Sequence, residues 1–383
     1  MESASYKLKP MYRYLMMLTI ASAIGNQGWQ TLFNNFAVDV GHLNGNQIGI
    51  IQGVREIPGL LALLAIFLIR FLREDRLSAL SILVLGGGLA ATGFFPGYSG
   101  ILITTLLMST GFHYYETTNQ SLMLQYFNAQ TAPKVIGNFR GLAAASNIFI
   151  GLLILSLSYF FAYRELYITV GIIVTFFAVW AFSKDPTEKH QQVQTKKLVI
   201  RKRYWLYYFL TFMSGARRQI FTAFAVFLLV KKFKYGVDEI AMLFVINNII
   251  NYFLSPAIGR AIAFFGERQI LSIEYSAVFF IFLAYAYVST KWMAGVLYIL
   301  DYIFFNFAIA INTYFQKIGD PREIASGIAV GFSINHIAAV VIPVIGGALW
   351  MIDYKIPFFA AAGLSIVSLL AVQKIHYVLP VKI

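Results

Sequence analysis

The chain has 383 residues, of which 59% are hydrophobic and only 12% are charged. A soluble protein carries roughly 25% charged residues, so the composition excludes a soluble globular fold and is typical of a polytopic membrane protein. The formal net charge of +13 is interpreted as basic loops at one membrane face, and no nucleic-acid partner is expected. The chain has no cysteine and its five histidines are scattered, so we expect no cofactor, no metal site and no disulfide.

Apolar segments of about 20 residues, enough to cross a bilayer, follow one another along the chain. The first comes after basic residues but is too long for a cleaved signal peptide, so we expect it to remain as a helix. Charge clusters and Gly or Pro breaks predict twelve membrane-spanning helices, at residues 11–38, 46–69, 77–96, 100–126, 135–161, 165–183, 203–230, 238–264, 270–290, 293–315, 323–350 and 356–378.

The long hydrophilic stretch at residues 184–203 lies at the midpoint, with six predicted helices on each side. If both termini are cytoplasmic, most lysines and arginines fall on the cytoplasmic side, as the positive-inside rule requires. The basic cluster at 231–234 is the sizeable exception. We therefore predict an N-terminal six-helix bundle at 1–183, a cytoplasmic linker at 184–203 and a C-terminal six-helix bundle at 204–383, with both termini in the cytoplasm.

The two halves also resemble each other, because Gly and amide-rich sequence at 25–30 is matched in depth by residues 215–219. A Gly-Arg and Gly-Glu-Arg pattern ends the eighth predicted span at 259–268, and the basic sequence 70–76 follows the second. Six and six helices around a basic loop, with these patterns, resemble the major facilitator superfamily. The resemblance implies an all-α fold of two pseudo-symmetric six-helix bundles that transports by alternating access, with spans 1, 4, 7 and 10 lining a central cavity.

Charged residues inside the predicted spans are the first candidates for a site, because a charge in the bilayer costs at least about 2.5–3.5 kcal/mol. Arg217 and Arg218 lie midway along the seventh span and are about 100° apart around the helix, so at most one faces a cavity directly. They predict an anion clamp, since a guanidinium binds carboxylate or phosphate in a bidentate manner. A structural ion pair or a side chain that reaches the membrane surface is the alternative.

Arg55 and Glu56 lie about ten residues into the second span. They are interpreted either as a substrate contact and a proton site, or as an interhelical salt bridge. On the fourth span, the spacing of His113 and Glu116 places both on one helix face, with Tyr114 beside it. Glu116 and His113 are candidate proton-coupling residues, and Tyr114 is a predicted substrate contact. The alternatives are a Glu116–Arg140 pair and a hydrogen-bonded helix contact for His113.

Polar residues on other spans complete the candidate set. Gln27 and Gln30 in the first span and Asn306 in the tenth are predicted substrate contacts, and Asp301 in the tenth is a candidate proton-coupling residue. Interhelical hydrogen bonding between amides is the alternative interpretation. Arginines outnumber acids deep within the predicted spans, which favours an anionic substrate; Glu274 is left out of this comparison because it lies near a predicted span end.

We therefore expect a secondary active transporter of a small anionic solute, and the residues leave open whether transport is coupled to protons. Proton-coupled efflux of drugs or amphiphiles is one alternative, although the fifth span lacks the Gly-Pro-x-x-Gly-Gly motif of drug/proton antiporters. A non-transporting sensor or a lipid-handling protein is another. An enzyme is not expected, because no activated nucleophile is visible. The expected partners are a small-molecule solute and membrane lipids, the expected state is a monomer, and the expected location is a bacterial inner membrane.

Overall fold

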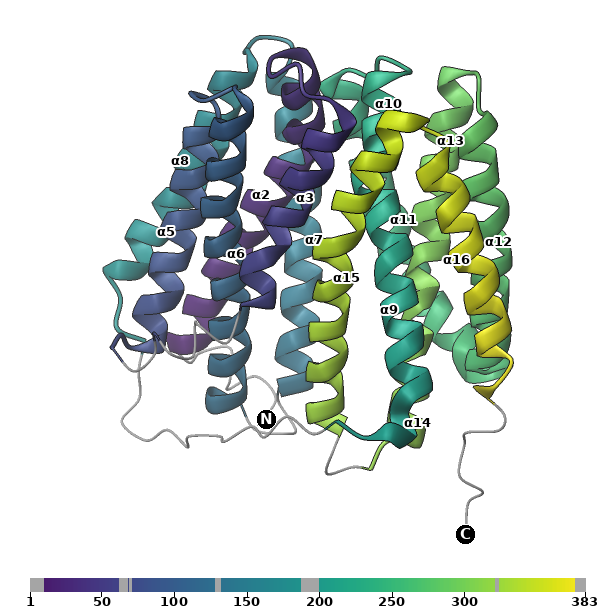
Figure 1. Ribbon diagram of the computed structural model, residues 1–383. Helices are drawn as coiled ribbons and strands as arrows, with labels where there is room; N and C mark the ends of the chain where they lie inside the picture. The colour runs from purple at the N-terminus through teal and green to yellow at the C-terminus, as the bar shows by residue number, and fades with distance from the viewer. Residues whose placement is uncertain are drawn as a thin grey trace. The chain divides into compact units, whose positions relative to one another are not determined.

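A computed structural model describes residues 10–61, 68, 71–127, 132–186, 200–320 and 324–375. Within these ranges the regular structure is helical and contains no β-strand (Figure 1). Twelve helical stretches follow one another: α2 (Pro10–Asp39), α3 (Gly45–Leu60), α5 (Glu74–Thr92), α6 (Tyr98–Tyr126), α7 (Ala132–Leu157), α8 (Tyr163–Phe182), the run of η2 (Lys202–Tyr204), α9 (Trp205–Ile220), η3 (Phe221–Ala225) and α10 (Val226–Lys231), α11 (Val237–Phe265), α12 (Glu267–Tyr287), the run of α13 (Lys291–Phe305), η4 (Asn306–Ala308) and α14 (Ile309–Ile318), α15 (Ile324–Ile352) and α16 (Ile356–Val372). They correspond in order to the twelve predicted spans, so the predicted all-α membrane fold is confirmed. The last part of the second predicted span lies outside the described residues.

Several of these helices have the length and composition needed to cross a bilayer. Among the described residues seven stretches meet both conditions: Glu74–Thr92, Val135–Leu157, Tyr163–Phe182, Lys202–Lys231, Glu267–Tyr287, Lys291–Ile318 and Val330–Ile352. Large apolar side chains such as Phe176 on α8 and Phe280 on α12 are exposed on them, as expected for faces that meet lipid. The protein is therefore a multi-pass membrane protein.

The chain forms two compact units that are not contiguous in sequence. The first contains residues 1–42, 54–195 and 236–245, and the second contains residues 43–53, 196–235 and 246–383. Two helices, α3 and α11, are thus divided between the units. The predicted boundaries at 183 and 204 remain a prediction, and residues 187–199 of the predicted linker lie outside the described part of the chain.

In the first unit, α5 packs between α6 and α8 through a row of glycines. A Cβ atom at Gly88 would stand 2.7 Å from the backbone nitrogen of Met108 in α6, and a Cβ at Gly86 would stand 2.9 Å from that of Thr175 in α8. Gly87, between them, has nothing within 4 Å of its Cβ direction. Small residues on two faces of α5 therefore allow both neighbours to approach closely, which is the usual basis of helix association in membranes.

These glycines predict opposite effects of one substitution. Gly88→Ala is expected to destabilise the protein by about 1–3 kcal/mol, because the added methyl meets backbone atoms that cannot move aside. Gly87→Ala is expected to stabilise it by up to about 1 kcal/mol, because alanine is the better helix former. Thermal unfolding of both variants in detergent checks the pair, and an equal shift for both would contradict the packing.

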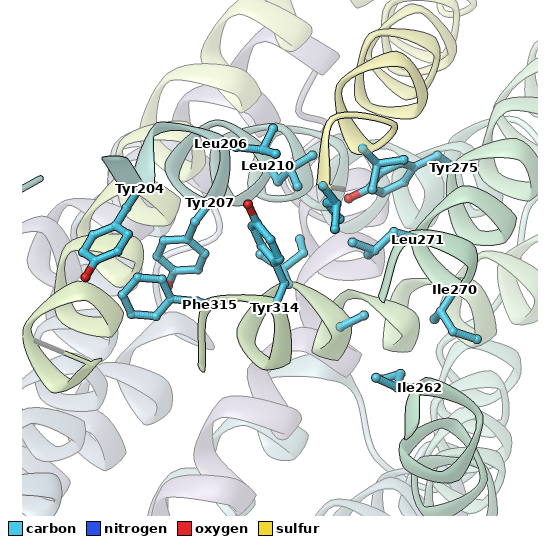
Figure 2. Close-up of a cluster of buried hydrophobic side chains, with 14 of the residues drawn as sticks. Tyr204, Leu206, Tyr207, Leu210, Ile262, Ile270, Leu271, Tyr275, Tyr314 and Phe315 are labelled. Atoms are coloured by element: carbon cyan, nitrogen blue, oxygen red, sulfur yellow. The ribbon is translucent and has the colours of Figure 1, made fainter. Parts of the chain in front are cut away.

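In the second unit, α9 packs against α15 and α16, and α12 packs against α16 and α13. Figure 2 shows the buried cluster at one end of this unit, where Tyr207 of α9 stacks on Phe315 of α14 with ring centroids 4.2 Å apart. Leu271 and Tyr275 of α12 reach the same cluster. This apolar layer fixes α9, α12 and α14 together, and the charged residues of the next section lie on these helices and their neighbours.

Candidate functional site

The two adjacent arginines of the second unit lie on α9, where the helix changes its winding. Arg217 is buried, with 4% of its surface exposed, whereas Arg218 is exposed. Just beyond them the chain forms a π-helical turn, η3, before it resumes as α10. Such turns are frequent at functional sites. The two adjacent side chains therefore differ in burial, and whether either faces a central cavity stays a prediction.

Arg217 is held by neighbouring helices of the second unit. Its Nη1 donates a hydrogen bond to Ser368 Oγ on α16 at 2.5 Å, and its Nη2 lies 3.4 Å from Glu274 Oε1 on α12. Its guanidinium carbon stands 4.2 Å from the centre of the Tyr275 ring. The structural ion pair that the sequence left as an alternative is therefore present, and it involves an acid that the sequence analysis did not select.

Asp301 of α13 lies in the same place and is 2% exposed. Its Oδ2 atom has no hydrogen-bond partner among the described residues, and neither has Glu274 Oε2. A little further along the chain, α13 gives way to the 3₁₀ turn η4 at Asn306, whose Nδ2 donates to Tyr302 O at 2.9 Å. The predicted substrate contact Asn306 is thus engaged with its own helix.

A small pocket brings these groups together within the second unit. Arg218 lies against its rim, with the guanidinium carbon 5.2 Å from the centre of the Phe305 ring. The pocket has both signs of charge and apolar aromatic walls, and it is lined by Ser214, Arg217, Arg218, Phe221, Glu274, Val278, Phe282, Asp301 and Phe305. Three predicted residues, Arg217, Arg218 and Asp301, therefore meet here.

The first unit contains a second charged cluster, built on α3 and α6. Arg55 Nη2 and Glu56 Oε1 are 2.6 Å apart, with 14% and 9% of the side chains exposed. The guanidinium of Arg55 also lies over the ring of Trp29, at 5.0 Å, and the backbone oxygen of Arg55 accepts a hydrogen bond from Ser109. The ion pair is formed within one helix rather than between helices, which differs from the interhelical bridge considered above.

His113 of α6 continues this cluster in the first unit. One of its ring nitrogens lies within 4.8 Å of the Glu56 carboxylate, and its Nδ1 is 3.9 Å from Glu116 Oε2. The Glu116 side chain is 46% exposed. The face predicted for His113 and Glu116 is thus present, and Tyr114 is half-buried on α6 beside them. The structure therefore brings the Arg55–Glu56 pair of the second predicted span close to His113 of the fourth.

The polar residues of the first span lie on α2. Gln27 is buried and its Nε2 donates to Thr31 Oγ1 at 3.4 Å, while Gln30 is half-buried. Asn34, two turns after Gln27, is buried and its Oδ1 has no hydrogen-bond partner among the described residues. Gln27 is thus engaged with its own helix, and its predicted contact with substrate stays a prediction.

Sequence reasoning missed Glu274, Tyr275 and Ser368. Hydropathy predicts that the ninth span begins at residue 270, which puts Glu274 close to the start of the span. The helix begins at Glu267, after Gly266 takes a φ of 80° that separates α11 from α12, so Glu274 lies about two turns inside. An acid within an apolar segment was the available signal, and an error of three residues in the boundary concealed it.

The sequence-family model of the Major Facilitator Superfamily matches residues 14–343 of this chain. No curated protein matches the sequence. Among solved structures, the nucleoside transporter NupG, in a mutant form, is 16% identical with a TM-score of 0.79, and the match covers 95% of this chain and 99% of NupG.

Two further structures are similar over nearly their whole lengths. A bacterial homologue of the human lysosomal transporter Spinster is 12% identical with a TM-score of 0.73, and the match covers 99% of this chain and 95% of the homologue. A bacterial homologue of the iron transporter ferroportin is 10% identical with a TM-score of 0.75, and the match covers 95% of this chain and 98% of the homologue. At these identities the similarity establishes the fold, and together with the family match it shows that the chain belongs to the major facilitator superfamily of membrane transporters.

Proposed function

We propose that this protein is a secondary transporter that moves a small organic anion across the membrane by alternating access, coupled to protons. The observation that carries the proposal is the pair of arginines at the irregular turn of α9, of which Arg218 is exposed and lines a pocket. A guanidinium offers planar, paired donors to a carboxylate or phosphate. A charged arginine in the middle of a membrane span also has a large free-energy cost, which indicates that the residue has a function.

The two arginines have different tasks in this proposal. Arg217 already contacts Glu274 and Ser368, so it acts as a fixed internal charge. Arg218 is the solute contact. Its guanidinium lies over Phe305, and Phe221 and Phe282 form other walls of the same pocket. Aromatic walls beside a guanidinium favour an anion with a carbon skeleton over a bare inorganic ion.

Efflux of amphipathic compounds is a second candidate, supported by the same aromatic walls. It differs from the first in the role of Arg218, because a loose apolar cavity binds lipophilic cations or neutral compounds without a guanidinium. Residence in a bacterial inner membrane, cytoplasmic termini and a monomeric state belong to the proposal as well, and they rest on composition and on the distribution of basic residues.

A thermal-shift screen of the purified protein tests the proposal. The probes are monocarboxylates, dicarboxylates and organic phosphates, compared with lipophilic cations and neutral metabolites. One class of anion is expected to raise the unfolding midpoint, since a ligand at 100 times its Kd stabilises the folded state by about 2.7 kcal/mol. Arg218→Ala is expected to weaken this ligand about ten- to a hundredfold, the effect of losing a charged hydrogen bond.

Arg260→Ala is the matched control, because Arg260 is an exposed arginine on α11 and is not part of the pocket. It should leave the shift unchanged. Stabilisation by lipophilic cations alone, or an anion effect that is the same in wild type and Arg218→Ala, would refute the anion proposal and favour amphiphile efflux.

A further inference from the structure

The buried charges around Arg217 in the second unit do not balance. Arg217 is the buried cation that faces the two acids, and Glu274 and Asp301 are each 2% exposed. If both carboxylates were ionised, the group would carry one excess negative charge. An uncompensated charge away from water is strongly unfavourable. Arg218, the other cation that lines the pocket, is exposed to solvent and does not offset a buried negative charge, so a further cation is needed beside the carboxylates.

The unpaired atoms indicate where that cation is held. Glu274 Oε2 and Asp301 Oδ2 are both buried without a hydrogen-bond partner among the described residues, and both side chains line the same pocket. A buried acceptor without a donor destabilises the folded state, and more so when it is charged. A proton on one carboxylate removes the excess charge and turns one of these acceptors into a donor.

We propose that Asp301 and Glu274 form the coupling-proton site of this transporter, with Arg217 as its fixed counter-charge. Glu274 is already paired with Arg217 through its Oε1 atom, at 3.4 Å, and remains ionised. Asp301 carries the proton. When the proton leaves, Asp301 becomes a second anion beside a guanidinium that Glu274 already occupies. The inference rests on the proposed function, because it assigns the residues that hold the coupling proton of that transporter.

A proton fits this site better than a metal ion. The Arg217 guanidinium lies 3.4 Å from the Glu274 carboxylate and repels any metal cation that approaches. A metal ion would also need several oxygen ligands, whereas the charged oxygens here come from two carboxylates. A proton needs one oxygen.

The surrounding ionisable groups do not offer a competing site for this proton. Arg217 and Arg218 come from α9, Tyr275 and Tyr285 from α12, and Tyr298 and Tyr302 from α13. Helix α16, which supplies Ser368, has no ionisable side chain between Ile356 and Val372. Arginines stay protonated and the phenols stay neutral near neutral pH, so the two carboxylates are the groups that exchange protons.

The same arrangement explains how a proton is linked to an anion. A solute anion at Arg218 enters a pocket that Asp301 also lines, so an ionised Asp301 repels it. Protonation of Asp301 removes this repulsion. By thermodynamic reciprocity, a bound anion raises the affinity of Asp301 for the proton by the same factor by which the bound proton raises the affinity for the anion. Anion binding is therefore expected to strengthen as the pH falls.

Infrared spectroscopy of the purified protein, without any added solute, tests the proton site. Wild type is expected to show the carbonyl stretch of a protonated, buried carboxyl group at about pH 7, a band that ionised carboxylates lack. Asp301→Asn should remove this band, and Glu165→Gln, which alters an exposed acid at the start of α8, should keep it. Asparagine resembles the protonated acid in shape and charge, so the variant should fold.

Labelling provides the second measurement if Asp301→Asn does not fold. The band of wild type should shift when aspartate is labelled with ¹³C at the side-chain carboxyl, and it should not shift when glutamate is labelled. Absence of a protonated carboxyl band across about pH 5 to 9, or a band that follows glutamate, would overturn the assignment. The proposed function fails separately, because a band without any anion-induced thermal shift leaves a proton site with a different solute.

Discussion

Arg217→Met is expected to destabilise the folded protein by about 3–5 kcal/mol, the usual effect of removing one partner of a buried ion pair. The substitution leaves the Glu274 carboxylate at 2% exposure without its cation and removes the donor to Ser368. Methionine has a similar length and can fill the space over the Tyr275 ring, so the loss reflects the charge rather than a cavity. Equilibrium unfolding by SDS in mixed micelles measures the change.

Two variants separate this effect from a general disturbance of α9. Arg218→Met changes the adjacent, exposed arginine and is expected to alter stability by no more than about 0.5 kcal/mol. The double variant Arg217→Met with Glu274→Leu removes both ionised partners and should recover most of the loss, because an apolar pair often replaces a buried salt bridge without cost. Recovery also requires Asp301 to be neutral. A double variant as unstable as the single one would show that Asp301 is ionised.

The helices themselves could be predicted well from sequence, because hydropathy reports position along the membrane normal directly. It places Arg217 and Asp301 well inside their spans, and the structure brings them into one pocket. Hydropathy reports the direction of a side chain poorly. Glu116 has a useful predicted depth, yet its side chain is 46% exposed, whereas Glu274 has a predicted position near a span end and is buried beside Arg217.

Contacts between segments distant in sequence could not be predicted from the sequence either. Ser368 is an ordinary serine in an apolar helix until Arg217, 151 residues earlier, donates a hydrogen bond to it. The π turn at Phe221–Ala225 and the 3₁₀ turn at Asn306–Ala308 have no proline to signal them. Both interrupt helices next to the charged pocket, and the sequence alone gives no signal of them.

The divided helix α3 leads to the second prediction of large effect. Residues 45–53 of this helix belong to the second unit, while residues 54–60 belong to the first. Gly45, Gly49 and Gly53 repeat every four residues and face α15, and a Cβ at Gly49 would meet the backbone oxygen of Pro343 and stand 2.9 Å from the Cα of Gly347. An α-hydrogen of glycine therefore lies where any other residue has a carbon atom.

Gly49→Leu is accordingly expected to separate α3 from α15 and to destabilise the protein by about 1–3 kcal/mol or more. The obstacle is a carbonyl oxygen of a helix backbone, which cannot rotate away as a side chain can. Gly49→Ala should already have part of the effect, since the first carbon alone meets Pro343. Thermal unfolding in detergent measures both variants against wild type.

Gly363→Leu is the matched control, because Gly363 is an exposed position of α16 with nothing within 4 Å of its Cβ direction. Leucine there gains helix propensity and meets lipid or detergent, so the unfolding midpoint should stay equal or rise. If Gly49→Leu behaved like Gly363→Leu, the close approach of α3 to α15 would be wrong. The two variants add the same side chain to the same kind of helix and differ only in the neighbour that it meets. If Gly49→Leu unfolds at a lower temperature than wild type while Gly363→Leu does not, the glycine repeat is therefore what holds the first part of α3 to α15 in the second unit.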